Sequence, residues 1–186
     1  MRRMISILFI SVAVLALTGE LTGGSVSAQF SSTPCDATTD FVTGGGFIII
    51  PDLVIGAHAN FGVAGACKNG FFWGHLEYVD HGSGLAPVTP FKVHGTGVTA
   101  YFADPSDPTT TRWVGGTAET NDPSNPTVTY CVQVADNGEG GSGTGDTFLI
   151  FLSTGYTAGG PLVGGNIQLH KPNPLTPTDI CPLFPR

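Results

Sequence analysis

The chain has 186 residues, a formal net charge of −7 at pH 7, 27 glycines and 14 prolines, and only 11% of its residues are charged. The acidic balance argues against nucleic acid and anionic lipid surfaces as partners, because both repel a negatively charged protein. The length suits one domain with a sizeable core.

The N-terminal segment 1–28 has the pattern of a secretory signal peptide. Basic residues precede the apolar run Ile5–Leu17, and Val26–Ala28 ends in small residues that signal peptidases accept. The apolar run is shorter than the ~20 residues that span a bilayer, so we expect a released, extracellular product without a membrane span. The expected organisation is a signal peptide over 1–28, an extension over 29–40, a single all-β domain over 41–171 and a proline-rich tail over 172–186.

Short apolar runs separated by glycine and proline predict an all-β fold. Their hydrophobic period is two rather than 3.6, as in Thr127–Ala135, where four apolar side chains alternate with more polar ones. Lys68–Gly70 places Asn-Gly between two such runs and predicts a tight hairpin. The expected strands are Phe41–Ile50, His58–Ala66, Phe71–Asp80, Phe91–Val93, Gly97–Ala103, Thr111–Glu119, Thr127–Ala135, Thr147–Ser153 and Gly165–Lys171.

This spacing predicts an antiparallel β-sandwich or barrel of about 8–9 strands. Phe47–Ile50 and Phe148–Leu152 are apolar on both faces, so we expect those strands to be covered on each side.

The cysteines of an exported chain usually form disulfide bridges. We therefore expect a disulfide-stapled domain with two bridges, and the spacing leaves all three pairings open. A Cys₄ metal site is disfavoured because the chain has no C-x-x-C pair. The four cysteines are Cys35, Cys67, Cys131 and Cys181.

The glycine-rich segment Val134–Phe148 concentrates acidic side chains between two predicted strands. Carboxylate and amide oxygens on a flexible loop are the ligands that calcium prefers, so calcium is the cofactor that this loop suggests. The alternative is a hairpin loop in which the acids cap exposed backbone amides. The candidate calcium ligands are Asp136, Asn137, Glu139 and Asp146.

A second candidate site contains histidine and carboxylate side chains near the end of one predicted strand. His75 and Glu77 lie two residues apart on one strand face, and Asp80 and His81 follow. Such groups bind zinc or act as a general base, with His58, His94 and His170 as remote partners. The alternative is a polar strand face followed by a turn, since no H-E-x-x-H motif is present.

Aromatic side chains offer a further binding surface. Phe71 and Trp73 share a strand face with His75, and Trp113 lies on another strand. Exposed rings stack on sugars, whereas rings of this size also serve as core residues.

Several short segments together resemble the bacterial extracellular modules called post-COAP-1 domains. The resemblance implies a secreted all-β unit, either free-standing or joined to a larger surface protein. It implies no catalytic residue, because the family has no settled biochemical activity. The segments are Val42–Gly46, Ala59–Gly62, Gly74–Gly82, Asp136–Glu139 with Asp146–Phe148, and Gly164–His170.

The sequence therefore predicts a secreted, non-catalytic all-β module that binds a surface polysaccharide or another extracellular protein, or has a structural role, with structural calcium as an option. The alternative is a secreted hydrolase or metal-dependent enzyme that uses the His/Asp/Glu cluster. No G-x-S-x-G elbow is present to support nucleophilic hydrolysis.

Overall fold

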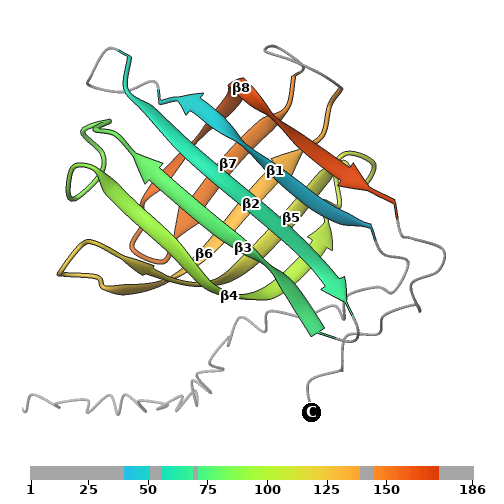
Figure 1. The fold of residues 1–186 in the computed structure, drawn as a ribbon, viewed down its shortest axis with the longest axis horizontal. Coiled ribbons are helices and arrows are strands. Elements are labelled where there is room, and N and C mark those ends of the chain that lie inside the picture. The colour runs from blue at the N-terminus through green and yellow to red at the C-terminus, as the bar shows by residue number, and fades with distance from the viewer. Residues whose placement is uncertain (1–39, 51–55, 69–70, 139–144, 172–186) are drawn as a thin grey trace, which may run out of the picture. The chain divides into compact units, whose positions relative to one another are not determined.

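A computed structural model describes residues 40–50, 56–68, 71–138 and 145–171. These residues form eight antiparallel strands in which each strand pairs with the next, and β1 pairs with β8 to close a barrel (Figure 1). Closure leaves no long strand edge exposed to other chains. The strands are β1 (Phe41–Ile49), β2 (His58–Lys68), β3 (Phe71–Asp80), β4 (Phe91–Ala103), β5 (Thr111–Thr120), β6 (Thr127–Ala135), β7 (Thr147–Leu152) and β8 (Thr157–His170).

The prediction of an antiparallel all-β fold is confirmed, and the architecture is a barrel rather than a sandwich. The two predicted runs Phe91–Val93 and Gly97–Ala103 belong to one strand, β4. Its pairing with β5 shifts register between Gly95 and Gly97 and again between Val98 and Ala100. These irregularities interrupt the alternation of side chains, which explains why the sequence pattern divided the strand.

Strand β8 begins at Thr157, well before the predicted start at Gly165. Its first half contains Gly159, Gly160 and Pro161, residue types that are uncommon within strands. Pro161 nevertheless lies opposite Thr147, at the first residue of β7. The sequence pattern therefore missed the first half of β8, because glycine and proline are typical of strand ends rather than strand interiors.

The barrel interior is filled by side chains. In β6, Val128, Tyr130, Val132 and Val134 are buried, as their alternation predicted. Eight strands enclose a space just wide enough for such side chains. The bulkiest fully buried side chains are Tyr78, Phe148, Ile48, Leu76, Ile150 and Ile167.

The prediction that the two all-apolar runs are covered on both sides is wrong. Ile49 in β1 is 41% exposed and Phe151 in β7 is 38% exposed. A closed barrel has one interior, so the alternate side chains of every strand face outward. Among the described residues, no helix has the length and apolar character needed to cross a membrane.

A partly buried ion pair lies at the barrel end where β1 begins. Arg112 is 7% exposed and donates hydrogen bonds to the carboxylate of Asp40. The hydroxyl of Tyr101 donates to Asp40 Oδ1 at 2.7 Å. Burial alone would lower the pKa of Arg112, but Asp40 outweighs it and the pKa is raised. The guanidinium therefore remains charged and fastens β5 to the start of β1.

The prediction of two disulfide bridges is wrong with respect to Cys131, which has a free thiol. Burial raises the pKa of that thiol. Cys35 and Cys181 lie outside the described residues. Four cysteines with one free thiol form at most one bridge, so the framework predicted from the even count does not hold.

Candidate functional site

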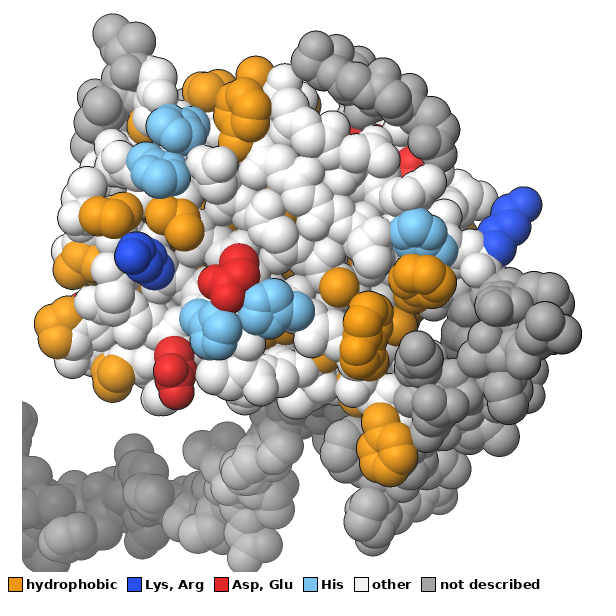
Figure 2. All heavy atoms as spheres, viewed as in Figure 1, with side chains coloured by type: hydrophobic (Ala, Val, Ile, Leu, Met, Phe, Trp, Pro, Cys, Tyr) orange, Lys and Arg blue, Asp and Glu red, His pale blue; other side chains and the backbone are white. Residues whose placement is uncertain are grey.

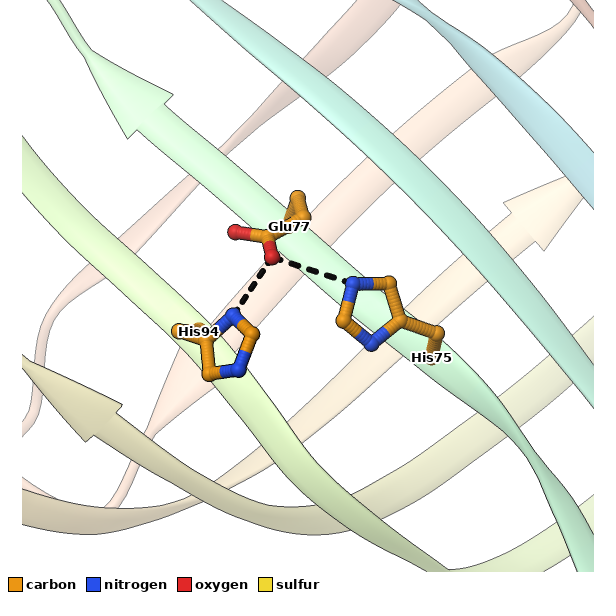
Figure 3. A group of neighbouring side chains, drawn as sticks. All are labelled: His75, Glu77 and His94. Atoms are coloured by element: carbon orange, nitrogen blue, oxygen red, sulfur yellow. Dashed lines mark hydrogen bonds and ion pairs between the residues drawn. The ribbon is translucent and has the colours of Figure 1, made fainter.

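Three polar side chains meet on the outer face of β3 and β4 (Figure 3). Glu77 Oε1 lies 3.0 Å from His75 Nε2 and 2.5 Å from His94 Nδ1. His75 and Glu77 are two residues apart on β3, while His94 lies directly opposite Glu77 on β4. All three side chains are about half exposed, at 50%, 49% and 58% for His75, Glu77 and His94. We call them the His–Glu cluster.

The structure separates the other two residues of the predicted His/Asp/Glu site from this cluster. Asp80 is fully buried, because it is an odd number of residues from Glu77 and therefore faces the interior. His81 follows the strand and stacks on His58, with 4.6 Å between ring centroids. The four predicted side chains therefore do not converge on one point, as a set of reacting groups must.

Asp80 instead belongs to a buried network at the barrel end opposite Asp40. Its carboxylate accepts hydrogen bonds from the backbone N–H groups of Gly82 and Ser83, at 2.9 Å each, and from the Ser83 hydroxyl at 2.5 Å. Tyr156 donates to it at 2.8 Å and lies 2.6 Å from the Tyr78 hydroxyl. This network joins β3, the segment after it and the turn before β8.

The hydrogen bonds decide the protonation of this network. Burial alone would raise the pKa of Asp80, but the donors from Ser83, Gly82 and Tyr156 hold the pKa below its usual value. Burial is the first cause that raises the pKa of Tyr78 and of Tyr156. The carboxylate therefore stays ionised and the two phenols stay neutral near pH 7, which suits a structural role.

The carboxylates of Asp136 and Asp146, between β6 and β7, accept hydrogen bonds from backbone N–H groups. Asp146 is fully buried, and its two carboxylate oxygens accept the N–H of Asn137 at 2.9 Å and of Ile167 at 2.8 Å. Asp136 Oδ2 accepts the N–H of Leu169 at 2.7 Å. Asn137 Nδ2 donates to the carbonyl of Gly145 at 2.9 Å. Glu139 lies outside the described residues, and calcium binding by this loop stays a prediction.

A shallow hollow lies beside the His–Glu cluster on the outer face of β1, β2, β3 and β8. Four of its lining residues are glycines, Gly46, Gly62, Gly164 and Gly165, and Gly62 on β2 pairs with Glu77 on β3. A Cβ atom added at Gly62 would meet nothing within 4 Å. The lining residues are Gly46, Phe47, Asn60, Phe61, Gly62, Glu77, Val79, Gly164 and Gly165.

The same face is seen from outside in Figure 2. An acidic side chain is flanked by two histidines, and a wide area of backbone and small uncoloured side chains lies next to them. The glycines that line the hollow have no side chains to cover the backbone there. Exposed peptide groups offer hydrogen-bond donors and acceptors to a ligand. The hollow therefore combines exposed peptide surface with the Glu77 carboxylate.

The side chains of Phe71, Trp73 and Trp113 lie on the outside of the barrel. Phe71 is 68% exposed and Trp73 is 47% exposed. Trp113 stacks between Phe102 and Phe151, with centroid separations of 6.4 and 6.2 Å. Its indole N–H donates to Asp104 Oδ2 at 2.7 Å, which fixes the ring. These rings belong to the outer surface rather than to the core.

Sequence reasoning found His75 and Glu77 but did not place His94 or the hollow. The hairpin signal at Lys68–Gly70 sets the β2–β3 register and could have placed Gly62 beside Glu77. The link from β3 to β4 spans residues 81–90, too long for turn rules to fix which residue faces Glu77.

Comparison with known proteins gives no further guide to the site. No protein-family model, curated protein or solved structure matches the chain.

Proposed function

We propose that the chain is a secreted, non-catalytic β-barrel module that binds a neutral polysaccharide in the hollow on its outer face. The observation that carries this proposal is the hollow itself, a glycine-lined depression bordered by Phe47, Asn60 and Glu77. The barrel interior is occupied by its own core side chains. A ligand therefore has to bind outside.

The chemistry of the hollow suits sugar hydroxyl groups. Glu77 supplies a carboxylate acceptor, and the exposed Asn60 supplies an amide with both donors and acceptors. Phe47 and Val79 are half-buried and provide apolar contact surface. Polar groups of this kind next to an aromatic ring are typical of sites that fix the orientation of a sugar.

The charge of the chain favours a neutral polymer over an anionic one. The net charge is −7, and Glu77 contributes a carboxylate at the hollow itself. A uronate or sulfate-bearing glycan would be repelled at this point. The second partner class predicted from sequence, an extracellular protein, is an outcome of the binding test below.

Two observations support a non-catalytic role over the alternative of a hydrolase or metal-dependent enzyme. Asp80, the candidate acid or base, is enclosed by hydrogen bonds inside the barrel. Asp136 and Asp146 are engaged by backbone amides. None of these three carboxylates lies in the His–Glu cluster, so the larger set of acid and base groups expected for an enzyme is not assembled there.

Further properties belong to the same proposal. Secretion is supported by the basic and apolar pattern of segment 1–28, and membership of the post-COAP-1 family by the short motifs that resemble it. A single disulfide bridge is supported by the bonded state of Cys67 together with the free thiol of Cys131. Calcium in the acidic loop is not part of this proposal, because both carboxylate oxygens of Asp146 accept backbone N–H groups.

A glycan array screened with the purified protein tests the function, followed by calorimetry on the glycans that bind. We expect neutral polysaccharides to be selected and binding to be abolished by Gly62→Val. The added Cβ meets no atom within 4 Å, so the new side chain fills the hollow without a backbone clash. Asn60→Ala should weaken binding by about tenfold, the loss of one or two hydrogen bonds.

Gly97→Val is the matched control. Gly97 lies on β4, and a Cβ atom there would make only an ordinary contact of 3.7 Å with Thr117 Oγ1. This variant should bind like the wild type. Binding that survives Gly62→Val, or an array without a glycan hit, would overturn the proposed site, and selective capture of a protein ligand would overturn the choice of a polysaccharide.

A further inference from the structure

We infer that His75, Glu77 and His94 form a binding site for a divalent transition metal ion of the zinc class. The inference does not rest on polysaccharide binding, although Glu77 belongs both to this site and to the hollow. It rests on the arrangement of one carboxylate and two imidazoles on the outer face of β3 and β4 (Figure 3).

The separations of the three donor atoms suit a shared metal ion. Zinc lies about 2.0–2.2 Å from nitrogen and oxygen ligands, so two ligands of a tetrahedral ion are about 3.3 Å apart. The three donor atoms here all lie within 4.8 Å of one another. Glu77 Oε1 is 3.0 Å from His75 Nε2 and 2.5 Å from His94 Nδ1, so small side-chain rotations admit an ion between them.

The strands hold the ligands in place before a metal ion arrives. Glu77 lies directly opposite His94 in the β3–β4 ladder, and His75 is on the same face of β3. Opposed residues of an antiparallel pair have Cβ atoms about 4.5–5.5 Å apart, a spacing fixed by the backbone. The hydrogen bonds to Glu77 also keep both rings turned toward the carboxylate, which reduces the entropy lost on metal binding.

The ligand types select the class of metal. Imidazole nitrogen suits zinc, copper, nickel and iron, whereas calcium and magnesium take oxygen ligands. Three protein ligands leave further coordination positions open to water, since each side chain is about half exposed. Glu119 lies opposite His94 on β5 and is exposed, so it adds negative charge near the incoming cation.

The test is a calorimetric titration of the purified, metal-free protein, without a histidine tag, with zinc. We expect about one zinc ion per chain, and an affinity lower by about tenfold or more in Glu77→Gln and in the double variant His75→Ala/His94→Ala. Paramagnetic cobalt should broaden the imidazole NMR signals of His75 and His94 ahead of those of the other histidines. This second measurement depends on the native protein alone, so it stands even if a variant folds poorly.

The matched control is the double variant His58→Ala/His81→Ala. The rings of His58 and His81 also lie close together, with 4.6 Å between their centroids. They should contribute nothing to zinc affinity. Equal losses in both double variants, undiminished binding without His75 and His94, or no zinc binding at millimolar concentration would each overturn the inference. Zinc binding with a negative glycan array would overturn only the proposed function.

Discussion

The carboxylate of Asp146, a loop residue, accepts the backbone N–H of Ile167 in β8 at 2.8 Å. Ile167 lies in a part of β8 that does not pair with the neighbouring strand β7. β7 has six residues and β8 has fourteen, so the C-terminal half of β8 extends past β7. Asp146 and Asp136 supply acceptors for amides on that half, at Ile167 and Leu169. Side-chain carboxylates from the residues before β7 thus supply hydrogen-bond acceptors to the part of β8 that lies beyond the first residue of β7.

Asp146→Ala should destabilise the barrel by about 2 kcal/mol or more, because two backbone amides lose a charged acceptor. The amides of Asn137 and Ile167 are the groups concerned. Asp136→Ala removes the acceptor of one amide and should have a smaller effect. Urea denaturation gives the free energy of unfolding, with Glu119→Ala on the exposed face as the control that should change it little.

The same measurement separates an amide-capping role from a calcium site. Since both carboxylate oxygens of Asp146 already accept hydrogen bonds, we expect the unfolding midpoint to be equal in calcium and in chelator. A midpoint raised by millimolar calcium, and insensitive to calcium in Asp146→Ala, would show that the loop binds the ion after all.

Two glycines on β2 should respond in opposite directions to alanine. Gly62→Ala should stabilise the protein by about 0.4–1 kcal/mol, since it restricts the unfolded chain and meets open space in the folded one. Gly65→Ala should destabilise it by about 1–3 kcal/mol, because the new Cβ would lie 2.6 Å from Val114 Cγ2 in the core. Thermal or urea unfolding of the two variants measures both changes in the free energy of unfolding. Equal changes would contradict the placement of Gly62 on the outer face and Gly65 on the inner face of β2.

Stability should fall in acid through Asp80. Its folded pKa is lowered from 3.8, despite burial, by the hydrogen bonds from Ser83, Gly82 and Tyr156. A carboxyl with a lowered folded pKa stabilises the native state above its unfolded pKa, and that stabilisation is lost as the pH falls through the folded pKa. We therefore expect the unfolding free energy to decline below about pH 4.

Ser83→Ala provides the comparison for this pH dependence. It removes the hydroxyl that donates to Asp80 Oδ2 at 2.5 Å, so the pKa of Asp80 should rise toward its unfolded value. The variant should be less stable than the wild type at pH 7, and the difference should shrink below about pH 4. A difference that is constant across this range would show that Asp80 does not carry the acid sensitivity.

Thiol titration should distinguish one bridge from two. If Cys67 forms the single bridge of the proposal, two of the four cysteines remain as thiols, and Cys131 is one of them. A denatured, non-reduced sample should therefore react at two thiols per chain. Cys131 should react slowly in the native protein, because burial raises the pKa of its thiol. Complete absence of thiols would restore the two-bridge framework.

The sequence was most informative where local chemistry decides structure. The alternation in Thr127–Ala135 identified β6 with both of its ends, and Asn-Gly at the β2–β3 turn identified a hairpin whose Lys68 pairs with Phe71. Period-two patterns report which face of a strand is buried. They do not report how far two strands overlap, and so they did not distinguish a barrel from a sandwich.

The candidate site depended on that missing information. Glu77 and His94 come together only through the β3–β4 register, and the amide partners of Asp136 and Asp146 lie on the part of β8 that passes β7. Both contacts depend on how far neighbouring strands overlap, which the side-chain pattern does not report. The acids of the loop were recognisable from the sequence, but the amides that they bind were not.

The pairing of β1 with β8 has a consequence for biosynthesis. Phe41 pairs with His170 and their rings stack with 4.4 Å between centroids, so the first strand completes its hydrogen bonds only with the last. Until β8 has been synthesised, β1 presents an open edge of the kind that other chains can join. The barrel therefore closes only after synthesis of its final strand, and aggregation of unfinished chains is the hazard that this topology creates.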